Sequence, residues 1–412
     1  MTGDPPTAPT RRVLGPHLLI VTLGRAAINV PFRIIYPFLP AIARGLGVSL
    51  AAASGLITLR LVGTLGSPFL GPLADRLGRR RVMVGALLLF ASASLLLAGT
   101  GAFAGAAIAF LLYGIAKALY DPAVYAYLGD TVAYHERGRA IGALELSWSS
   151  AWLLGVPASG FLIERLGWRA PWAVLILLGL LGAWVARTGL PSASRRFTGD
   201  GGESFVATLV TAWCDLLRRR SVLVFLFINL LLTLAVEIPF IVYGAWLEKA
   251  FGLSLTTLGL ASTVVGLAEA AAEFGTAVIT DRLGKRRSVL VGLLGLAASL
   301  VALPWLVQFG LAAALIGVAL MMLTFEFAWV SLMPLATELA PDARATLISL
   351  TAIPFSFGRI LGATVGGWLW QWQSIALHAG VGSVCALVAM LLLARGVREV
   401  GERREGTLPA AQ

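Results

Sequence analysis

Gly71-Pro72-Leu73-Ala74-Asp75-Arg76-Leu77-Gly78-Arg79-Arg80-Arg81 is a short charged turn between two long apolar stretches of the chain. It returns half a chain later as Asp281-Arg282-Leu283-Gly284-Lys285-Arg286-Arg287, in which six of seven residues are unchanged and the seventh exchanges Arg for Lys. A charged turn that occurs once in each half indicates an internal repeat, in which two equivalent bundles of membrane helices follow one another.

The composition supports a membrane protein. Of the 412 residues, 58% are hydrophobic and 13% are charged, whereas soluble domains carry about 25% charged residues. About 20 apolar residues are enough to cross a bilayer. The sequence contains twelve such stretches, at residues 17–42, 50–73, 82–100, 104–129, 140–163, 170–188, 221–248, 256–279, 288–307, 310–337, 346–370 and 374–395. It therefore predicts an all-α membrane protein with twelve transmembrane helices, arranged as two pseudo-symmetric six-helix bundles.

The stretch between the two predicted bundles has the composition of a linker. Residues 191–202 are rich in Ser, Gly and charge, which is typical of connections between domains. Apolar residues then recur at helical spacing before three arginines, so residues 205–220 favour an amphipathic helix at the membrane surface over a simple tether. We expect an N-terminal bundle at 1–190, a linker at 191–220, a C-terminal bundle at 221–396 and a cytoplasmic tail at 397–412.

The positions of the basic residues predict how the chain lies in the membrane. Lys and Arg gather in short cytoplasmic loops. With both termini inside, only four of the 32 basic residues fall on the outer side, namely Arg44, Arg165, Arg169 and Lys249. Because the net charge of +11 is spread over the loops of one face, it favours contact with anionic lipid over binding of nucleic acid. We expect a multi-pass protein of the bacterial cytoplasmic membrane.

The sequence indicates neither a metal site nor a catalytic centre. Its two cysteines, Cys214 and Cys385, lack metal-ligand spacing, and its three histidines fall near the predicted ends of spans. The sequence also lacks a Gly-x-Ser-x-Gly elbow, a zinc-protease histidine pair and a phosphate-binding glycine loop. We therefore expect no cofactor and no enzymatic activity.

Eleven ionisable residues fall inside the predicted spans, where an unpaired charge costs several kcal/mol. They comprise five bases, Arg25, Arg33, Arg60, Lys117 and Arg359, and six acids, Asp121, Glu145, Glu237, Glu269, Glu273 and Glu326. Four of the bases lie in the first half of the chain and four of the acids in the second. This asymmetry predicts a cavity with one basic wall and one acidic wall.

Glu237 and Glu326 are the first candidates for proton coupling. Each lies near the middle of its span among apolar residues, and a carboxyl that burial keeps partly protonated suits this role. Glu269 and Glu273 share a helix face, where like charges repel, so we expect one of them to be protonated or paired with an arginine such as Arg359. The alternative for each acid is a structural hydrogen bond to a neighbouring helix.

A polar stripe in the fourth span predicts substrate contacts. Tyr113, Lys117 and Tyr120 follow i, i+4, i+7 spacing and share one side of a helix. They predict a pocket for an anionic or zwitterionic, partly aromatic molecule. Two alternatives compete, since the tyrosines can pack against neighbouring helices and Lys117 can form a local ion pair with Asp121. The predicted substrate-binding set is Arg33, Tyr36, Arg60, Tyr113, Lys117, Tyr120 and Asp121.

The charged turn at residues 71–81 resembles motif A of the major facilitator superfamily of transporters, and the resemblance extends over nearly the whole chain. In that family the motif's aspartate and arginines help to hold the cytoplasmic side closed. By this resemblance the gate residues would be Gly71, Asp75, Arg76, Gly78 and Arg79, with Asp281, Arg282 and Arg286 in the second copy. Asp130 and Glu338, at the inner ends of their spans, would pair with arginines of the motif.

Other features of the family are matched unevenly. The family's cavity-lining helices 1, 4, 7 and 10 here carry Arg25, Arg33, Lys117, Asp121, Glu237 and Glu326. Phe110 stands where proton-coupled members have an arginine in helix 4. The helix 5 antiporter motif is degraded, and a better copy in helix 11 consists of Gly358, Gly362, Ala363, Gly366 and Gly367. Close helix packing explains that copy equally well.

The resemblance, which is closest to bacterial drug:proton antiporter-like members, implies a secondary active transporter that moves a small molecule by alternating access. Proton-coupled efflux of amphipathic compounds is the first expectation. Proton-coupled uptake of an anionic nutrient, through the side that carries Arg33 and Arg60, is the alternative. An alternative of another class is a transporter-derived membrane sensor. Because two complete bundles need no partner chain, we expect a monomer whose partners are its substrate, protons and membrane lipid.

Overall fold

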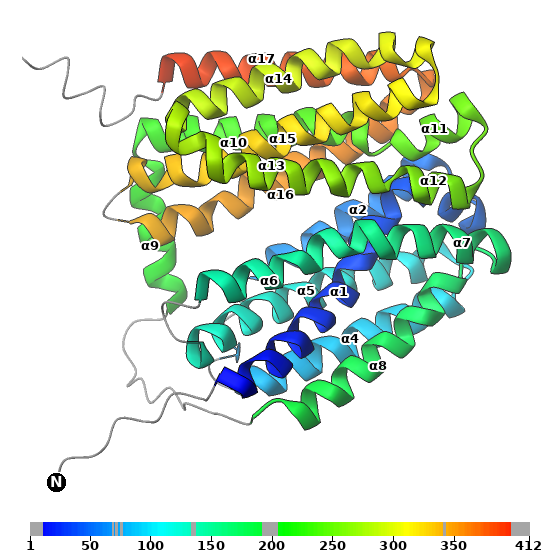
Figure 1. The fold of residues 1–412 in the computed structure, drawn as a ribbon, viewed down its shortest axis with the longest axis vertical. Coiled ribbons are helices and arrows are strands. Elements are labelled where there is room, and N and C mark those ends of the chain that lie inside the picture. Colours follow the sequence, from blue (N-terminus) through cyan, green and yellow to red (C-terminus); the bar gives the residue numbers. More distant parts are fainter. Residues whose placement is uncertain are drawn as a thin grey trace, which may run out of the picture. The chain divides into compact units, whose positions relative to one another are not determined.

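The computed structural model of the chain describes residues 11–67, 70, 73–74, 77–132, 137–191, 205–340 and 343–396. In these ranges the secondary structure is helical (Figure 1). The elements of the first half are α1 (Arg11–Leu46), α2 (Leu50–Leu65), α4 (Arg79–Gly99), α5 (Phe103–Thr131), α6 (Arg137–Ser150), the π-helix η2 (Ala151–Gly155), α7 (Val156–Leu166) and α8 (Ala170–Gly189). Those of the second half are α9 (Phe205–Leu217), α10 (Arg220–Phe240), α11 (Tyr243–Phe251), α12 (Leu255–Ala261), α13 (Thr263–Leu283), α14 (Lys285–Leu306), η3 (Val307–Phe309), α15 (Leu311–Leu339), α16 (Arg344–Leu369), η4 (Trp370–Trp372) and α17 (Ile375–Gly396).

These helices follow the predicted membrane spans in order. Eleven helical segments within the described residues are long and apolar enough to cross a membrane. The remaining predicted span, residues 50–73, contains the shorter apolar helix α2, and the residues that follow this helix are described only in part. The predicted fold class, an all-α protein with many membrane-spanning helices, is confirmed.

Three of the predicted spans are interrupted helices, and in two of them the break lies near a proline. The span at 256–279, which has no proline at its break, is divided into α12 and α13. The span at 140–163 consists of α6, η2 and α7, and its π-helical turn ends two residues before Pro157. The span at 221–248 is broken into α10 and α11, and α10 ends one residue after Pro239. Proline has no amide hydrogen to donate to the preceding turn, so the two interruptions near a proline have a local cause in the sequence.

The described helices form two compact units. Unit 1 comprises Met1–Ile35, Arg44–Val48 and Leu59–Gly199, and unit 2 comprises Tyr36–Ala43, Ser49–Thr58 and Asp200–Gln412. The second part of α1 and the first part of α2 thus group with unit 2, although the sequence places them in the N-terminal half. Residues 192–204 of the predicted linker and the whole predicted tail, 397–412, lie outside the described residues.

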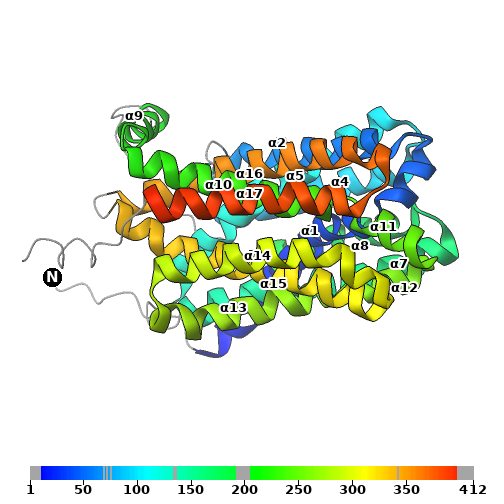
Figure 2. The same cartoon turned by 90° about the horizontal axis from the view of Figure 1, so that it is seen from above.

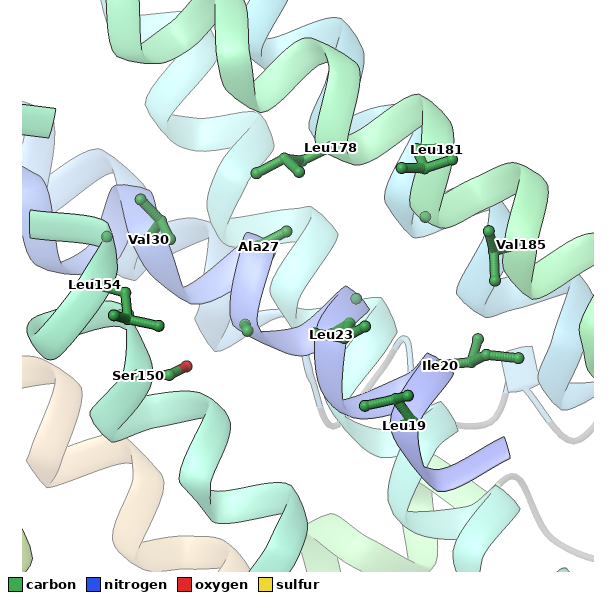
Figure 3. Close-up of a pocket in the computed structure, with 15 residues that line it drawn as sticks. Leu19, Ile20, Leu23, Ala27, Val30, Ser150, Leu154, Leu178, Leu181 and Val185 are labelled. Carbon is green, nitrogen blue, oxygen red and sulfur yellow. The ribbon is translucent and has the colours of Figure 1, made fainter. Parts of the chain in front are cut away.

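Within unit 1, α4 packs against both α5 and α8. An apolar cavity lies among α1, the junction of α6 with η2, and α8 (Figure 3). Within unit 2, α10 packs against α16 and α17, and α14 packs against α15 and α17 (Figure 2). Helix α9 contacts α10 and α16 and in Figure 1 runs across the direction of these helices at one end of the unit. It corresponds to the surface helix that the sequence predicts at 205–220.

The sequence repeat is also a repeat of backbone conformation. Gly78 and Gly284 occupy the same place in the two charged turns, and their φ angles are +93° and +87°. Each glycine directly precedes a long helix, α4 or α14. Because side chains other than glycine rarely adopt this conformation, glycine at both positions allows the turn to reverse direction between two spans.

Candidate functional site

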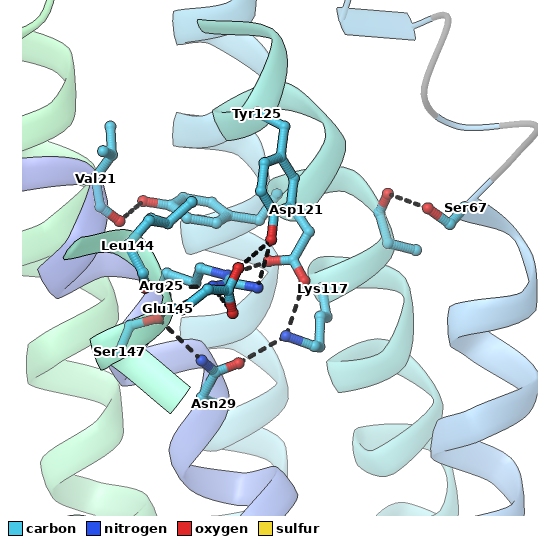
Figure 4. Close-up of polar contacts among 12 residues, drawn as sticks. Val21, Arg25, Asn29, Ser67, Lys117, Asp121, Tyr125, Leu144, Glu145 and Ser147 are labelled. Atoms are coloured by element: carbon cyan, nitrogen blue, oxygen red, sulfur yellow. Dashed lines mark hydrogen bonds and ion pairs between the residues drawn. The ribbon is translucent and has the colours of Figure 1, made fainter. Parts of the chain in front are cut away.

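A network of charged side chains occupies the interior of unit 1, and Arg25 lies at its centre. Arg25 lies on α1 and is 6% exposed. Its Nε is 3.2 Å from Asp121 Oδ1 on α5, and its Nη1 is 3.0 Å from Glu145 Oε2 on α6. The guanidinium therefore joins three helices through two carboxylates (Figure 4).

Lys117 completes this network. Its ammonium is 2.9 Å from Asp121 Oδ2 and donates to Asn29 Oδ1 at 2.6 Å. Asn29 in turn donates to Ser147 Oγ at 3.3 Å. Asp121 is thus shared by two cations, and the local Lys117–Asp121 ion pair that the sequence offered as an alternative is present.

The Tyr125 hydroxyl links Arg25 to Glu145. The hydroxyl accepts from Arg25 Nη2 at 3.1 Å and donates to Glu145 Oε1. We call the set of Arg25, Asn29, Lys117, Asp121, Tyr125, Glu145 and Ser147 the Arg25 network. Its two cations and two carboxylates balance in charge, which is the condition under which ionised groups are tolerated at membrane depth.

Two tryptophans border this network. The Arg33 guanidinium lies 3.8 Å from the ring centre of Trp148 and 4.9 Å from that of Trp152. The Lys117 ammonium lies 5.0 Å from Trp148. Arg33 is 3% exposed, so these cation–π contacts replace part of the water that the charge would otherwise bind. Trp148 therefore offers an aromatic face beside two cations.

Arg60, from the predicted substrate set, reaches the backbone of α1. It donates from Nη1 to the carbonyl oxygens of Pro31 and Phe32, at 3.3 Å and 3.0 Å. Its guanidinium also lies 4.3 Å from the ring centre of Phe32. At 1% exposure, this side chain is a structural link between α2 and α1.

The predicted stripe of Tyr113, Lys117 and Tyr120 is divided among different neighbours. The Tyr113 hydroxyl donates to Ser94 Oγ at 2.9 Å, and the Tyr120 hydroxyl donates to the carbonyl oxygen of Val21 at 3.0 Å. Both tyrosines are buried between helices. The alternative in which they pack against neighbouring helices describes their positions, because i+4 and i+7 spacing still spreads side chains over a wide face of a helix.

A second buried ion pair lies in unit 2. Glu237 on α10 is 1% exposed, and its Oε2 is 3.0 Å from Arg359 Nε on α16. Tyr36, in the part of α1 that belongs to unit 2, donates to Glu237 Oε1 at 2.9 Å and accepts from Arg359 Nη2. We call these three residues the Glu237 triad.

Glycines on α16 bring the members of this triad together. A Cβ on Gly358 would lie 1.9 Å from Thr233 Oγ1, and one on Gly362 would lie 2.6 Å from Glu237 Cβ. The missing side chains let α16 approach α10 closely, and Arg359 follows Gly358 directly. The close-packing explanation of the helix 11 glycines is therefore confirmed.

This packing gives Arg359 a different partner from the one suggested by the sequence. Arg359 was named as an example of an arginine that could match Glu269 or Glu273 on α13, and it pairs with Glu237. That one of these two acids is protonated or paired with another arginine stays a prediction. Glu269 is buried, whereas Glu273 and Glu326 on α13 and α15 are partly exposed. Spacing along α13 predicted repulsion within one helix, but it contained no information on which helix lies beside α16.

The two charged turns make equivalent contacts in the two halves. Arg79 Nε is 3.3 Å from Asp130 Oδ2, and Lys285 Nζ is 2.5 Å from Glu338 Oε1. The predicted pairing of Asp130 with a basic residue of the turn is confirmed, and Glu338 pairs with the lysine of the second copy. Gly71, Asp75 and Arg76 lie outside the described residues, as does the side chain of Asp281, and Arg282 is exposed.

The next basic residue of each turn donates a hydrogen bond to the end of a later helix in the same unit. Arg80 Nη1 donates to the carbonyl oxygen of Leu190 at 3.0 Å, at the end of α8. Arg286 Nη2 donates to the carbonyl oxygen of Ala394 at 2.8 Å, at the end of α17. Carbonyl groups in the last turn of a helix lack partners within the helix, so an arginine there satisfies them.

Sequence reasoning missed several members of these clusters. Asn29, Tyr125, Ser147 and Trp148 carry no motif, and none of them is charged at neutral pH. For Asn29 and Tyr125, sequence spacing could have indicated their role, since Asn29 lies four residues after Arg25 and Tyr125 lies four residues after Asp121. A polar residue one helical turn from a buried charge is a candidate partner for it.

Comparison with known proteins places this fold and these turns in a family. The family model described as Major Facilitator Superfamily matches residues 21–241 and 225–411. An uncharacterized MFS-type transporter of Bacillus subtilis (strain 168), YceJ, is 23% identical over 90% of this chain and 93% of its own length. Multidrug resistance protein 2 of the same organism is 23% identical over 82% of this chain and 84% of its length.

Solved structures are similar in fold. The crystal structure of the D-xylose–proton symporter has a TM-score of 0.75 and 18% sequence identity, covering 94% of this chain and 98% of that one. The nucleoside transporter NupG has a TM-score of 0.76 and 14% identity, with coverages of 91% and 99%. At these identities the likeness concerns the fold alone.

Proposed function

The chain belongs to the major facilitator superfamily and is a multi-pass secondary transporter, and from that premise we propose that it exports amphipathic compounds by a proton-coupled mechanism in which Glu237 carries the proton. The Glu237 triad is the observation on which this proposal rests. A carboxylate that is 1% exposed within a span is costly unless it is paired or protonated. Glu237 is paired with Arg359 in the described conformation, and in our proposal it is protonated in the alternative one.

Protonation of Glu237 has a direct mechanical consequence. The neutral acid no longer attracts Arg359 by charge, so the link between α10 and α16 weakens. Because the proton binds more tightly to the conformation in which Glu237 is separated from Arg359, protonation favours that conformation. Tyr36 contacts both charged partners, and it provides a third element that responds to the same proton.

The surroundings of the triad and one relative support the proposed substrate class. Tyr36 packs against Phe240 with ring centres 4.7 Å apart, and Arg359 lies over Phe355 at 5.6 Å. Aromatic faces beside a single ion pair suit a molecule with a large apolar part and one polar group. One relative is named as a multidrug resistance protein, which fits the same class.

Several other candidate residues retain their predicted roles in this proposal. Glu326, Glu269 and Glu273 are further proton-coupling candidates, and Lys117, Asp121 and Arg33 are substrate-binding candidates. The paired residues Arg79 and Asp130 belong to the conformational gate, together with Gly71, Asp75, Arg76, Gly78, Asp281, Arg282 and Arg286. We place the protein as a monomer in the bacterial cytoplasmic membrane, with both termini in the cytoplasm and lipid around its spans.

Uptake of an anionic solute is the second candidate function. It is favoured by the cations around Trp148, where the Arg33 and Lys117 side chains both lie within cation–π distance of the ring. An aromatic or zwitterionic carboxylate would meet positive charge and an aromatic face at that place. Under this function the Arg33→Gln variant would lose uptake of organic anions.

Proton movement in vesicles separates these functions. We would reconstitute the purified protein in liposomes that contain a pH-sensitive dye and add cationic drugs, organic anions and sugars under an imposed proton gradient. Export of amphipathic compounds predicts proton movement with the drugs only. Glu237→Gln should abolish it, and Glu164→Gln, a control on the exposed part of α7, should not.

The same vesicles give the contrary outcomes. Drug flux with no proton movement would leave a uniporter or another coupling ion, and the role of Glu237 would be structural. Proton movement with organic anions only would select the uptake function. Intact coupling in Glu237→Gln but loss in Glu326→Gln would transfer the proton-carrying role to α15.

A further inference from the structure

The apolar cavity of unit 1 is lined by none of the residues of the Arg25 network. It has a volume of about 570 Å³ and is lined by α1, by the junction of α6 with η2, and by α8. Its lining is apolar except for Ser150, whose hydroxyl donates to the carbonyl oxygen of Ser147 at 3.0 Å. Figure 3 shows the apolar side chains of these helices arranged around one open space.

The cavity opens to the surroundings of the chain. Leu19 and Leu181 are 58% and 55% exposed, and Leu154 is 70% exposed. All three line the cavity. Since the surrounding helices span a membrane, the medium at these exposed leucines is lipid, and the occupant of the cavity must come from the bilayer or pass through it.

Length and chemistry identify the occupant. Along α1 the lining runs from Leu19 to Val30, which is about 16 Å at 1.5 Å per residue. Half of a hydrocarbon core of about 30 Å is nearly the same length. The lining has no charged group, and its one hydroxyl already donates to a carbonyl oxygen. A polar molecule would therefore lose its hydrogen bonds to water on entering the cavity, whereas a methylene chain would not. The volume also suffices, because a water molecule occupies about 30 Å³ and a methylene group is similar in size.

The basic end of α8 favours one kind of lipid. Arg187 lies two residues after Val185, the last cavity residue of α8, and its side chain is exposed. Arg187 is at the depth where the headgroup of a lipid would lie if the acyl chain filled the cavity, but it lies on the opposite face of α8 from Val185, so it provides positive charge in the headgroup layer and not a contact inside the cavity. Basic residues at this depth attract anionic headgroups.

We propose that this cavity binds one acyl chain of an anionic phospholipid from the leaflet at the Arg187 end of α8. The π-helical turn η2 contributes Ala151, Leu154 and Gly155 to the lining, so the bound chain contacts an irregular point of a span. Such turns are frequent at functional sites. The site is independent of the proton-coupled export proposed above.

A photoreactive lipid tests the site directly. The full chain would be reconstituted in phosphatidylethanolamine vesicles that contain phosphatidylglycerol with a diazirine in one acyl chain, irradiated, and mapped by mass spectrometry. Label should concentrate on residues 19–30, 150–155 and 178–185. Ala27→Phe and Ala26→Phe place a ring in the cavity and should lose most of this label. Ala298→Phe, on an exposed position of α14, should keep it.

Other outcomes would overturn the proposal. Label spread evenly over the exposed helices, or unchanged in both filling variants of a folded protein, would mean that the cavity holds no lipid chain. Displacement of the label by excess tetraphenylphosphonium would assign the cavity to an amphipathic solute instead. Arg187→Gln should remove the preference for phosphatidylglycerol over an equally labelled phosphatidylethanolamine, and an unchanged preference would contradict the anionic headgroup.

Discussion

Asp121 is the residue on which the polar interior of unit 1 depends. Arg25 and Lys117 each contact one of its oxygens, so neither cation is satisfied by Asp121 alone. Glu145 provides the second negative charge, and Asn29 and Ser147 connect the network to α6. Each charged residue stabilises the network by balancing the charge of the whole set, because removal of one charge leaves an opposite charge unpaired at membrane depth.

Arg25 gives the first prediction at this scale. Arg25→Met leaves Glu145 without its cation, and we expect the free energy of unfolding to fall by about 3 kcal/mol. The double variant Arg25→Met with Glu145→Gln removes both charges and should recover part of that loss. Unfolding by SDS in mixed micelles measures both. Arg165→Met, at an exposed position on α7, is the control, and an equal loss in it would contradict a specific network.

At the scale of single elements, α16 can lie close to α10 because glycines replace larger side chains at the contact. Gly358 and Gly362 stand where any Cβ would meet Thr233 or Glu237 of α10. The charged turns are positioned by a glycine of another kind, with a positive φ at Gly78 and Gly284. Close approach of two helices and a positive φ angle are different reasons for a glycine. The effect of replacing glycine by alanine can be predicted separately for each.

Gly362→Ala tests the close approach of α16. The new methyl group would lie 2.6 Å from Glu237 Cβ and 3.0 Å from its Cγ, so the two helices must separate. We expect a loss of about 1–3 kcal/mol in stability, together with weaker proton coupling because Arg359 moves away from Glu237. Gly380→Ala is the matched control, since nothing lies within 4 Å of a Cβ at that position of α17. Similar effects of both variants would mean that packing at Gly362 is not the cause.

Gly78→Ala tests the conformation of the first charged turn. A Cβ at this position meets nothing within 4 Å, but the φ of +93° is strained for alanine. We expect a cost of about 1–3 kcal/mol, and Gly284→Ala should show the same cost because its turn has the same conformation. Gly85→Ala, in open space within α4, should be neutral or stabilising. A different result at the two turns would mean that they are not equivalent elements. The stability of each variant is measured by the same SDS titration.

At the scale of the whole molecule, the repeat accounts for most of what could be predicted from the sequence. The apolar stretches predicted the spans, and the copied turn at Asp281–Arg287 predicted two similar halves. Family membership also confirms the prediction of a transporter that is not an enzyme. These features are encoded locally, by runs of similar residues and by glycines, so the order of residues alone is sufficient to find them.

The candidate site was predicted less well, for a physical reason. The sequence identified Glu237, Arg359 and Tyr36 as buried polar residues, but it assigned them to different functions. Their contact depends on how closely α10 and α16 approach, and this distance follows from packing between segments more than 100 residues apart in sequence. Helical periodicity fixes neighbours along one helix, such as Lys117 and Asp121, and contains no such long-range information.

The topology of the whole chain gives a further prediction. Cys214 is an exposed thiol on α9, and it should be protected from a membrane-impermeant maleimide in intact cells if the linker is cytoplasmic. Ala102→Cys, in the exposed turn before α5, should be labelled in the same cells when Cys214 and Cys385 are replaced by Ser. Labelling of Cys214 without permeabilisation would reverse the orientation inferred from the basic residues.

The position of Tyr36 in unit 2 also has a consequence for biogenesis. Its hydroxyl contacts Glu237, 201 residues later, and Arg359, 323 residues later. During synthesis α1 enters the membrane before either partner has been translated, so the second part of α1 is without Glu237 while five further predicted spans are inserted, and without Arg359 while nine are. Arg80, in contrast, meets Leu190 before the linker is made. The contact between Arg80 and the end of α8 can therefore form while the first half is being synthesised, whereas the polar contacts of Tyr36 form only after most of the second half has been made.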